Sequence, residues 1–359
     1  MHPNKNYEQD IEYVTKQSHF LLRILGIWPL VDRDLSAAEM IYKILLIIVC
    51  CILVCFEGIP VMLYCMFITE EEPGSKLKMI APMIYSFNAL AKYGTLIVYE
   101  NEIRSCLKHI KDDWKSLSVL NARDIMMDKA KTGRHMFTIC CTFLYFAGLS
   151  YHTIVPLSRG RMVTSKNITI RPLAYAGYFV LFDEQLSPAY EIVFLLQFFG
   201  GFVMYSVTIV IYGLAALLVM HACAQMKILM ILMEEFVDKQ TCKEKIVDKK
   251  LAMEWQDGNT ANVCTFLVAL ASDTVNIFLL CYIGEHITAT TDQVAWTINT
   301  LEWYRLPTKM TRDIVLMVFI SHIPLKITAG KFITLSFKTF GDVMKSVVVY
   351  FNILCTVTE

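Results

Sequence analysis

The hydrophobic residues of this chain run together in long blocks. The blocks are residues 44–68, 79–99, 136–158, 192–220 and 262–284, and residues 314–330 lead into a further apolar stretch at 346–358. A helix of ~20 predominantly apolar residues crosses the hydrocarbon core of a bilayer. Because lipid offers the backbone no hydrogen-bond partners, such blocks have to be helical. The pattern predicts an all-α polytopic membrane protein with six spans visible from hydropathy.

Composition agrees with the block pattern. Of the 359 residues, 55% are hydrophobic and 18% are charged, and 33 basic residues balance 33 acidic ones. Soluble domains are typically ~45–50% apolar and ~25% charged. The shift toward apolar residues disfavours both a soluble enzyme and a disordered chain.

Basic residues gather in two of the connections between blocks. They are Arg104, Lys108, Lys111, Lys115, Arg123, Lys129, Lys131 and Arg134 in one, and Lys227, Lys239, Lys243, Lys245, Lys249 and Lys250 in the other. The positive-inside rule places both connections in the cytoplasm. The sequon at Asn167 lies in the connection 159–190, where glycosylation requires an extracellular loop. These signals predict a cytoplasmic N-terminal segment, 1–40, and four spans within 41–223.

The sequence contains no motif that is typical of an enzyme active site. Most of its 12 cysteines lie within apolar blocks, where cysteine behaves as a small hydrophobe, and the connection 159–190 has none. The histidines are far apart and have no Cys-x-x-Cys partners, so we expect no metal and no structural disulfide. Phosphate-binding loops, nucleophile elbows and zinc-protease motifs are absent from the sequence. The prediction is a protein without catalytic residues or cofactors.

Three charged residues fall inside the apolar blocks: Glu57, Lys92 and Asp273. Intramembrane charges often mark ion or proton pathways. Lys92 lies toward the cytoplasmic end of its block, where it can snorkel to the interface. Glu57 can cap a hydroxyl of a neighbouring helix. Asp273 can line a hydrated cavity or bond to a neighbouring hydroxyl. No repeated charge series of a pump or voltage sensor is present, and the signature triplets of G-protein-coupled receptors are missing.

The C-terminal third carries a resemblance. Residues 302–340 read EWYRLPTKMTRDIVLMVFISHIPLKITAGKFITLSFKTF, residues 281–285 read CYIGE, and residues 18–29 read SHFLLRILGIWP. Together these segments resemble the insect odorant receptor family. The matching positions in the first segment are Trp303, Tyr304, Pro307, Arg312, Pro324, Thr328, Ala329, Gly330, Leu335, Ser336 and Phe340.

The resemblance implies seven spans, with the N-terminus inside and the C-terminus outside. Aligned in this way, the blocks here are spans one, two, three, four, six and seven. Residues 224–261 would then hold a cytoplasmic loop and the remnant of a fifth span that is missing or shortened. Residues 262–312 would hold span six and a cytoplasmic anchor, and residues 313–359 a split span seven. The alternative is that 225–250 itself re-enters the membrane.

The same resemblance implies a hetero-tetramer with an odorant coreceptor that forms a ligand-gated, non-selective cation channel. Because the chain lacks the coreceptor's long cytoplasmic insertion, we expect a tuning subunit. The seventh helix would line the pore with Ser346, Tyr350, Ile353, Thr356 and Val357. Tyr350, Ile353 and Val357 share one helix face, which can gate by dewetting or simply pack against lipid. The subunit anchor would contain Trp303, Tyr304, Pro307, Arg312, Gly330 and Phe340, together with a half-helix at 314–326. The helix would break between Pro324 and Gly330, before the pore helix.

A small volatile ligand requires an apolar, aromatic pocket with few polar groups. The resemblance places it in the outer halves of spans two, three, four and six. The candidate residues are Met83, Tyr85, Phe87, Phe146, Gly148, Tyr151, Tyr190, Phe194, Gln197, Thr265 and Phe266. Aromatic residues of membrane helices also serve as packing or interfacial belt residues, and that alternative stays open.

The implied location is the plasma membrane of sensory neurons, in contact with lipid, without nucleic acid and without a required G protein. Two alternatives remain. One is a gustatory-type receptor of the same superfamily, and the other is a truncated, non-functional or regulatory membrane subunit.

Overall fold

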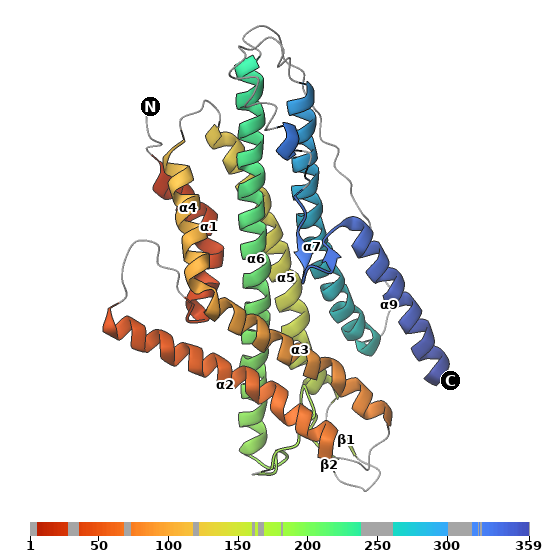
Figure 1. The fold of residues 1–359 in the computed structure, drawn as a ribbon. Coiled ribbons are helices and arrows are strands. Elements are labelled where there is room, and N and C mark those ends of the chain that lie inside the picture. The colour runs from red at the N-terminus through yellow and green to blue at the C-terminus, as the bar shows by residue number, and fades with distance from the viewer. Residues whose placement is uncertain are drawn as a thin grey trace. The chain divides into compact units, whose positions relative to one another are not determined.

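The computed structural model describes residues 6–27, 36–67, 73–117, 122–159, 162–163, 169–180, 182–237, 261–300, 318–321, 323 and 325–358. Its helices are α1 (Tyr7–Ile24), α2 (Ala37–Phe67), α3 (Pro73–Val98), α4 (Glu100–Lys115), α5 (Ala122–Arg159), α6 (Ala189–Val237), α7 (Ala261–Thr300) and α9 (Phe337–Thr358). Two short antiparallel hairpins pair β1 (Met162–Val163) with β2 (Thr169–Ile170) and β3 (Thr328–Ala329) with β4 (Ile333–Thr334) (Figure 1). The predicted all-α fold class is confirmed.

The chain divides into two compact units. Unit 1 contains residues 1–116, 134–215 and 265–273, and unit 2 contains residues 117–133, 216–264 and 274–359. Both α6 and α7 have residues in each unit. The connection 238–260 lies outside the described residues, so the missing or shortened fifth span stays a prediction.

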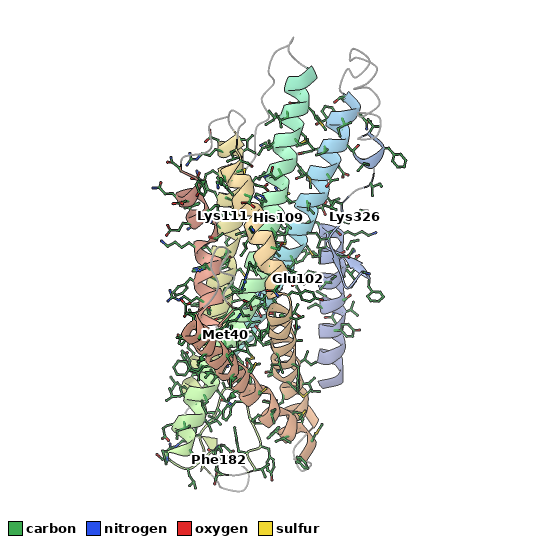
Figure 2. The ribbon with its side chains drawn as sticks, turned by 60° about the vertical axis from the view of Figure 1, so that its left-hand side comes forward. Met40, Glu102, His109, Lys111, Phe182 and Lys326 are labelled. Atoms are coloured by element: carbon green, nitrogen blue, oxygen red, sulfur yellow. The ribbon has the colours of Figure 1, made fainter. Side chains whose placement is uncertain are left out.

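Helix α2 shows how the apolar blocks are used. Its buried residues include Cys50, Val54, Glu57 and Val61, which recur every three or four positions and therefore form one face. This face turns toward the interior of unit 1, where α2 lies along α3 (Figure 1). The remaining surface is apolar but exposed, as Met40 illustrates in Figure 2. An extended apolar surface of this kind suits contact with lipid.

Three helices in the described part of the chain are long and apolar enough to cross a membrane. They are Ala37–Phe67, Ala122–Ser158 and Ala189–Glu234. The most apolar window of α6 is 72% buried inside the chain, against 33% for α2. Within α6, the buried hydroxyls of Ser206 and Thr208 donate to the carbonyl oxygens four residues earlier. Helix α6 is therefore surrounded mainly by protein, and α2 is more open to lipid.

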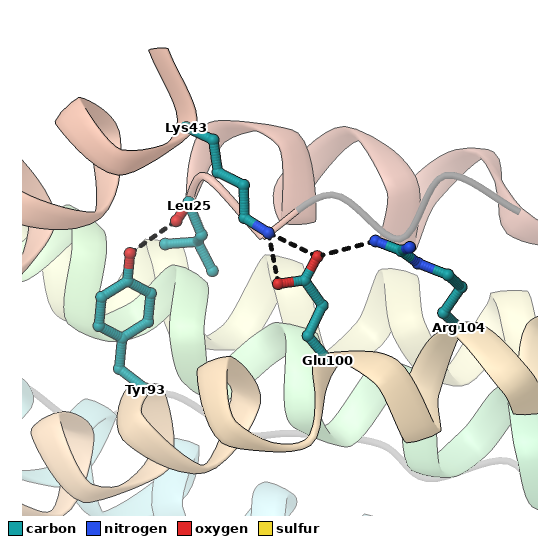
Figure 3. A network of polar contacts seen from close by, with 5 residues as sticks. All are labelled: Leu25, Lys43, Tyr93, Glu100 and Arg104. Atoms are coloured by element: carbon teal, nitrogen blue, oxygen red, sulfur yellow. Dashed lines mark hydrogen bonds and ion pairs between the residues drawn. The ribbon is translucent and has the colours of Figure 1, made fainter. Parts of the chain in front are cut away.

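A polar network joins the ends of four helices in unit 1 (Figure 3). The Tyr93 hydroxyl donates to the carbonyl oxygen of Leu25, which follows α1, at 2.6 Å. The Lys43 ammonium of α2 donates to both carboxylate oxygens of Glu100, at 2.6 and 2.5 Å. The Arg104 guanidinium lies 3.4 Å from the same carboxylate. Because the Glu100 side chain is only 11% exposed, it is screened less than a surface carboxylate.

Unit 2 contains the end of α6, most of α7, the β3–β4 hairpin and α9. The Lys129 ammonium of α5 lies 3.2 Å from His286 Nε2, two residues beyond the predicted span 262–284. Burial of the imidazole, together with the charge of Lys129, lowers the pKa of His286. The imidazole is therefore neutral where it meets the Lys129 cation near pH 7.

The predicted break in the last apolar region is confirmed. Residues 325–327 are not helical, and β3 and β4 form a hairpin whose turn has positive φ at Gly330 and Lys331 (61° and 65°). The predicted half-helix at 314–326 is too long, because its described residues are helical at 318–321 and no longer helical at 325. The backbone there leads into the hairpin, which the bond from Leu335 N to Ile327 O closes at 2.9 Å.

Replacing Glu100 with alanine tests the network. The change leaves the partly buried Lys43 without its carboxylate, so we expect the free energy of unfolding to fall by about 1–3 kcal/mol. Glu102→Ala, at an exposed position of α4 (Figure 2), is the matched control and should change it by less than about 0.5 kcal/mol. Unfolding of the detergent-solubilised protein measures both. Equal effects of the two variants would contradict a structural role for the network.

Candidate ligand-binding site

A carboxyl and an imidazole meet in the interior of unit 1. Glu57 Oε1 of α2 lies 3.6 Å from His152 Nε2 of α5, and neither side chain has any exposed surface. The other ring nitrogen, His152 Nδ1, lies 2.9 Å from the carbonyl oxygen of Gly148. Ionisable groups inside a membrane helix bundle usually face one another, as these two side chains do.

Glycines of α6 and α5 make room for the pair. A Cβ on Gly200 would lie 2.7 Å from Glu57 Cγ, and a Cβ on Gly201 would lie 2.6 Å from the His152 ring. On α5, a Cβ on Gly148 would lie 2.1 Å from the Tyr205 ring. Any larger residue at these three positions would displace its neighbour.

Tyrosine rings surround His152. The ring of Tyr175 meets it edge-on with centroids 5.2 Å apart, and that of Tyr205 with centroids 5.8 Å apart. Tyr151 lies 5.4 Å from Tyr175, and Tyr85 of α3 lies 5.8 Å from Tyr205. Such tilted and edge-to-face contacts are favourable between aromatic rings. The rings therefore form one connected aromatic group, to which α3, α5, α6 and the segment before α6 contribute.

One amide completes the group. Gln197 Nε2 donates to the carbonyl oxygen of Tyr175 at 3.1 Å, while its Oε1 is buried without a hydrogen-bond partner. Glu57, Tyr85, Tyr151, His152, Tyr175, Gln197 and Tyr205 are called the interior cluster below. The cluster combines broad aromatic surfaces with a few buried polar atoms, which is the composition expected for a small-molecule site.

The segment 171–180 closes over one end of the helices that carry the cluster. Tyr178 N donates to the carbonyl oxygen of Pro60 at 3.0 Å, and the Tyr190 hydroxyl donates to that of Pro172 at 2.9 Å. A Cβ on Gly177 would lie 2.8 Å from Pro60 Cβ, so the segment touches α2 closely. The contacts hold Tyr175 in place within the interior cluster.

Six of the predicted ligand residues lie in or near the cluster. Tyr85, Gly148, Tyr151 and Gln197 take part in its contacts directly. Tyr190 and Phe194 stack with centroids 6.3 Å apart on the same face of α6 as Gln197.

The other predicted ligand residues have no described contact with the cluster. Met83 is half-buried on α3, and Phe87 and Phe146 are 44% and 66% exposed. Thr265 and Phe266 lie in α7, and their side chains are outside the described residues. The role of all these positions in ligand binding stays a prediction.

Sequence reasoning missed Glu57, His152, Tyr175 and Tyr205. The suggestion that Glu57 caps a hydroxyl was wrong, because its carboxylate faces His152. The sequence did contain a signal for the contact of Glu57 with His152, since a lone intramembrane carboxylate requires a polar partner and His152 lies in another span. The Lys92 ammonium lies over the Tyr212 ring, 5.2 Å from the centroid, and its snorkelling to the interface stays a prediction.

The predicted pore and anchor residues are only partly described. Tyr350 is 68% exposed, and the Ser346 hydroxyl donates to the carbonyl oxygen of Asp342. Ile353, Thr356 and Val357 lie in α9, but their side chains are outside the described part. Gly330 forms the hairpin turn, and Phe340 packs against Phe278. Trp303, Tyr304, Pro307, Arg312 and Asn167 lie outside the described residues.

The comparison of this sequence with known families decides its family. The sequence profile described as 7tm Odorant receptor matches residues 72–270 and 253–348, which together are most of the chain. The chain belongs to the odorant receptor family. It is therefore an olfactory membrane receptor and not an enzyme. No curated protein sequence matches it.

Two solved structures share the receptor's fold. The insect olfactory receptor OR5 from Machilis hrabei in complex with eugenol aligns with a TM-score of 0.71 at 15% identity. The same protein, described without eugenol, aligns with a TM-score of 0.68 at 14% identity. Both alignments cover 98% of this chain and 100% of the other. The helices of this receptor are therefore arranged as in an insect olfactory receptor.

Replacing Gly148 with alanine tests the close packing of the cluster. The new methyl group would overlap the Tyr205 ring, so we expect the free energy of unfolding to fall by about 1–3 kcal/mol. Gly94→Ala, in α3, is the matched control. Nothing lies within 4 Å of its added Cβ, and the higher helix propensity of alanine should stabilise the receptor by up to about 1 kcal/mol. In the same unfolding assay, the changes in the free energy of unfolding should have opposite signs for the two variants. No change in either variant would contradict the close packing of Gly148 against Tyr205.

Proposed function

We propose that this receptor is the tuning subunit of a ligand-gated, non-selective cation channel that it forms with an odorant coreceptor. In this proposal a small volatile organic molecule binds in the interior cluster and opens a pore lined by α9. The observation that carries the proposal is the cluster itself, in which aromatic rings enclose a few buried polar atoms. Family membership supports the same conclusion.

The chemistry of the cluster favours a ligand that is mainly apolar. The rings of Tyr151, Tyr175 and Tyr205 offer aromatic surface, and Gln197 Oε1 offers a buried acceptor. A small molecule with one hydrogen-bond donor would satisfy that acceptor and leave its apolar part against the rings. The eugenol complex of the similar receptor from Machilis hrabei supports a small organic ligand.

The surface of α9 supports a role at a pore or between subunits. Val348, Val349 and Tyr350 are 58%, 55% and 68% exposed in the single chain. In an assembly such a helix can present one face to the pore and another to neighbouring chains. The location that we propose is the plasma membrane of sensory neurons, with the N-terminus in the cytoplasm.

The rival proposal is a truncated, regulatory or non-functional membrane subunit. It rests on the apolar blocks of the sequence, which leave no evident fifth crossing between residues 220 and 262. A gustatory-type receptor of the same superfamily is a further alternative, which a panel of tastants would test.

The function is tested by co-expression with a coreceptor and recording of odour-evoked current. Once an agonist is found, Tyr151→Ala and Gln197→Leu should each raise its half-maximal concentration by roughly 10-fold, the size expected for loss of one buried contact. Phe143→Ala, at an exposed position of α5, is the aromatic control and should shift it less than about 2-fold. Equal shifts in all three variants would argue against the cluster as the binding site.

A glycosylation tag at the C-terminus tests the topology. We expect the tag to be modified, because the proposed pore helix ends outside the cell. Full-length protein at the cell surface, detected by biotinylation, serves as the control for synthesis. A tag that stays unmodified on surface protein would contradict the extracellular C-terminus and favour a chain with an even number of crossings.

A further inference from the structure

One face of α7 holds the hairpin and the beginning of α9. Phe278, Tyr282, Glu285 and Thr288 are spaced by three or four residues and therefore lie on the same side of the helix. The Phe278 ring lies 6.0 Å from that of Phe337 and 5.4 Å from that of Phe340. The Tyr282 ring lies 6.2 Å from that of Phe337. The Thr288 hydroxyl donates to the carbonyl oxygen of Leu325 at 3.3 Å.

At the centre of this face the two backbones touch. A Cβ on Gly284 would lie 2.2 Å from the carbonyl oxygen of Leu335 and 2.6 Å from Leu335 Cβ. Only glycine leaves room for that carbonyl. Leu335, two residues before α9, therefore contacts α7 directly.

Glu285 meets the first turn of α9. Its Oε2 accepts a hydrogen bond from Phe337 N at 3.2 Å. The Ser336 hydroxyl accepts one from Thr339 N at 3.3 Å. The first amides of a helix have no partners inside the helix, and they favour negative charge. Ser336 caps α9 from its own chain segment, and Glu285 supplies the carboxylate from a different helix.

Helix α7 is one continuous element from Ala261 to Thr300. It contains the predicted ligand residues Thr265 and Phe266, and Glu285 follows 20 residues after Thr265. At 1.5 Å per residue this distance is roughly 30 Å along the helix axis. A displacement of α7 along its axis would therefore move the surface that contacts the start of α9 by the same amount.

We propose that Gly284 and Glu285 form the joint through which α7 positions α9, so that movement of α7 on ligand binding is passed to the pore helix. This role rests on the proposed channel function. Gly284 allows the backbones to meet, and Glu285 fixes the end of α9 by a charge-assisted hydrogen bond. Both are positioning residues, because they act on the pore through α9 and do not touch the ligand.

The test compares Glu285→Ala and Glu285→Gln with Asp292→Ala, a matched removal of charge at an exposed position of the same helix. Agonist-evoked maximal current is normalised to surface protein, and agonist affinity is measured separately on the purified assembly. Glu285→Ala should lower the maximal current roughly 3- to 10-fold with affinity within about 2-fold, the effect of losing one charge-assisted bond. Glu285→Gln keeps an acceptor oxygen and should lie between wild type and Glu285→Ala.

A second pair of variants, each a Gly→Ala change in a helix, tests the joint independently of Glu285. Gly284→Ala should also lower the maximal current, because Leu335 has to move. Gly341→Ala in α9, where nothing lies within 4 Å of an added Cβ, should leave it unchanged. If the wild-type receptor passes current and Glu285→Ala gives the same maximal current as Asp292→Ala, the proposed joint is overturned. The channel function would not be affected by that result. A wild-type chain that reaches the surface and passes no current would overturn the channel function, and the coupling role with it.

Discussion

The pair of Glu57 and His152 sets the conditions for the interior of unit 1. A carboxyl and an imidazole without exposed surface face each other there, as ionisable groups inside a membrane bundle usually do. The contact joins α2 to α5, and His152 lies where the rings of Tyr175 and Tyr205 meet it edge-on. The aromatic lining of the proposed ligand site therefore depends on a polar contact at its centre.

Close approach by glycine recurs in both units. In unit 1, Gly200 and Gly201 let α6 lie against the polar pair. In unit 2, Gly284 lets the backbone before α9 rest on α7. Lipid supplies little hydrophobic driving force between helices, so close packing and a few hydrogen bonds have to hold them together. Because only close packing and a few hydrogen bonds hold it, the α7–α9 joint would be sensitive to small displacements, as a gating element requires.

Much of the fold could be predicted from the sequence. The apolar blocks located the helices, because a membrane leaves a continuous apolar run no other backbone structure. The break between Pro324 and Gly330 followed from the conformational limits of proline and glycine. Tyr85, Gly148, Tyr151 and Gln197 were named as candidates because the family resemblance implied a pocket in the outer halves of their spans.

The partners of those residues could not be predicted in the same way. Hydropathy gives the depth of a residue but not its direction around the helix axis, so Phe146 looked as suitable as Tyr151 although it is exposed. Nor does spacing along the chain show which helices meet, because packing decides that Glu57 faces His152 and that Glu285 caps α9. The sequence by itself determined a helical membrane protein and one apolar block in each of its long helices. The tertiary structure decided which faces are buried and which polar groups meet, because packing against neighbouring helices sets how each helix is turned about its axis.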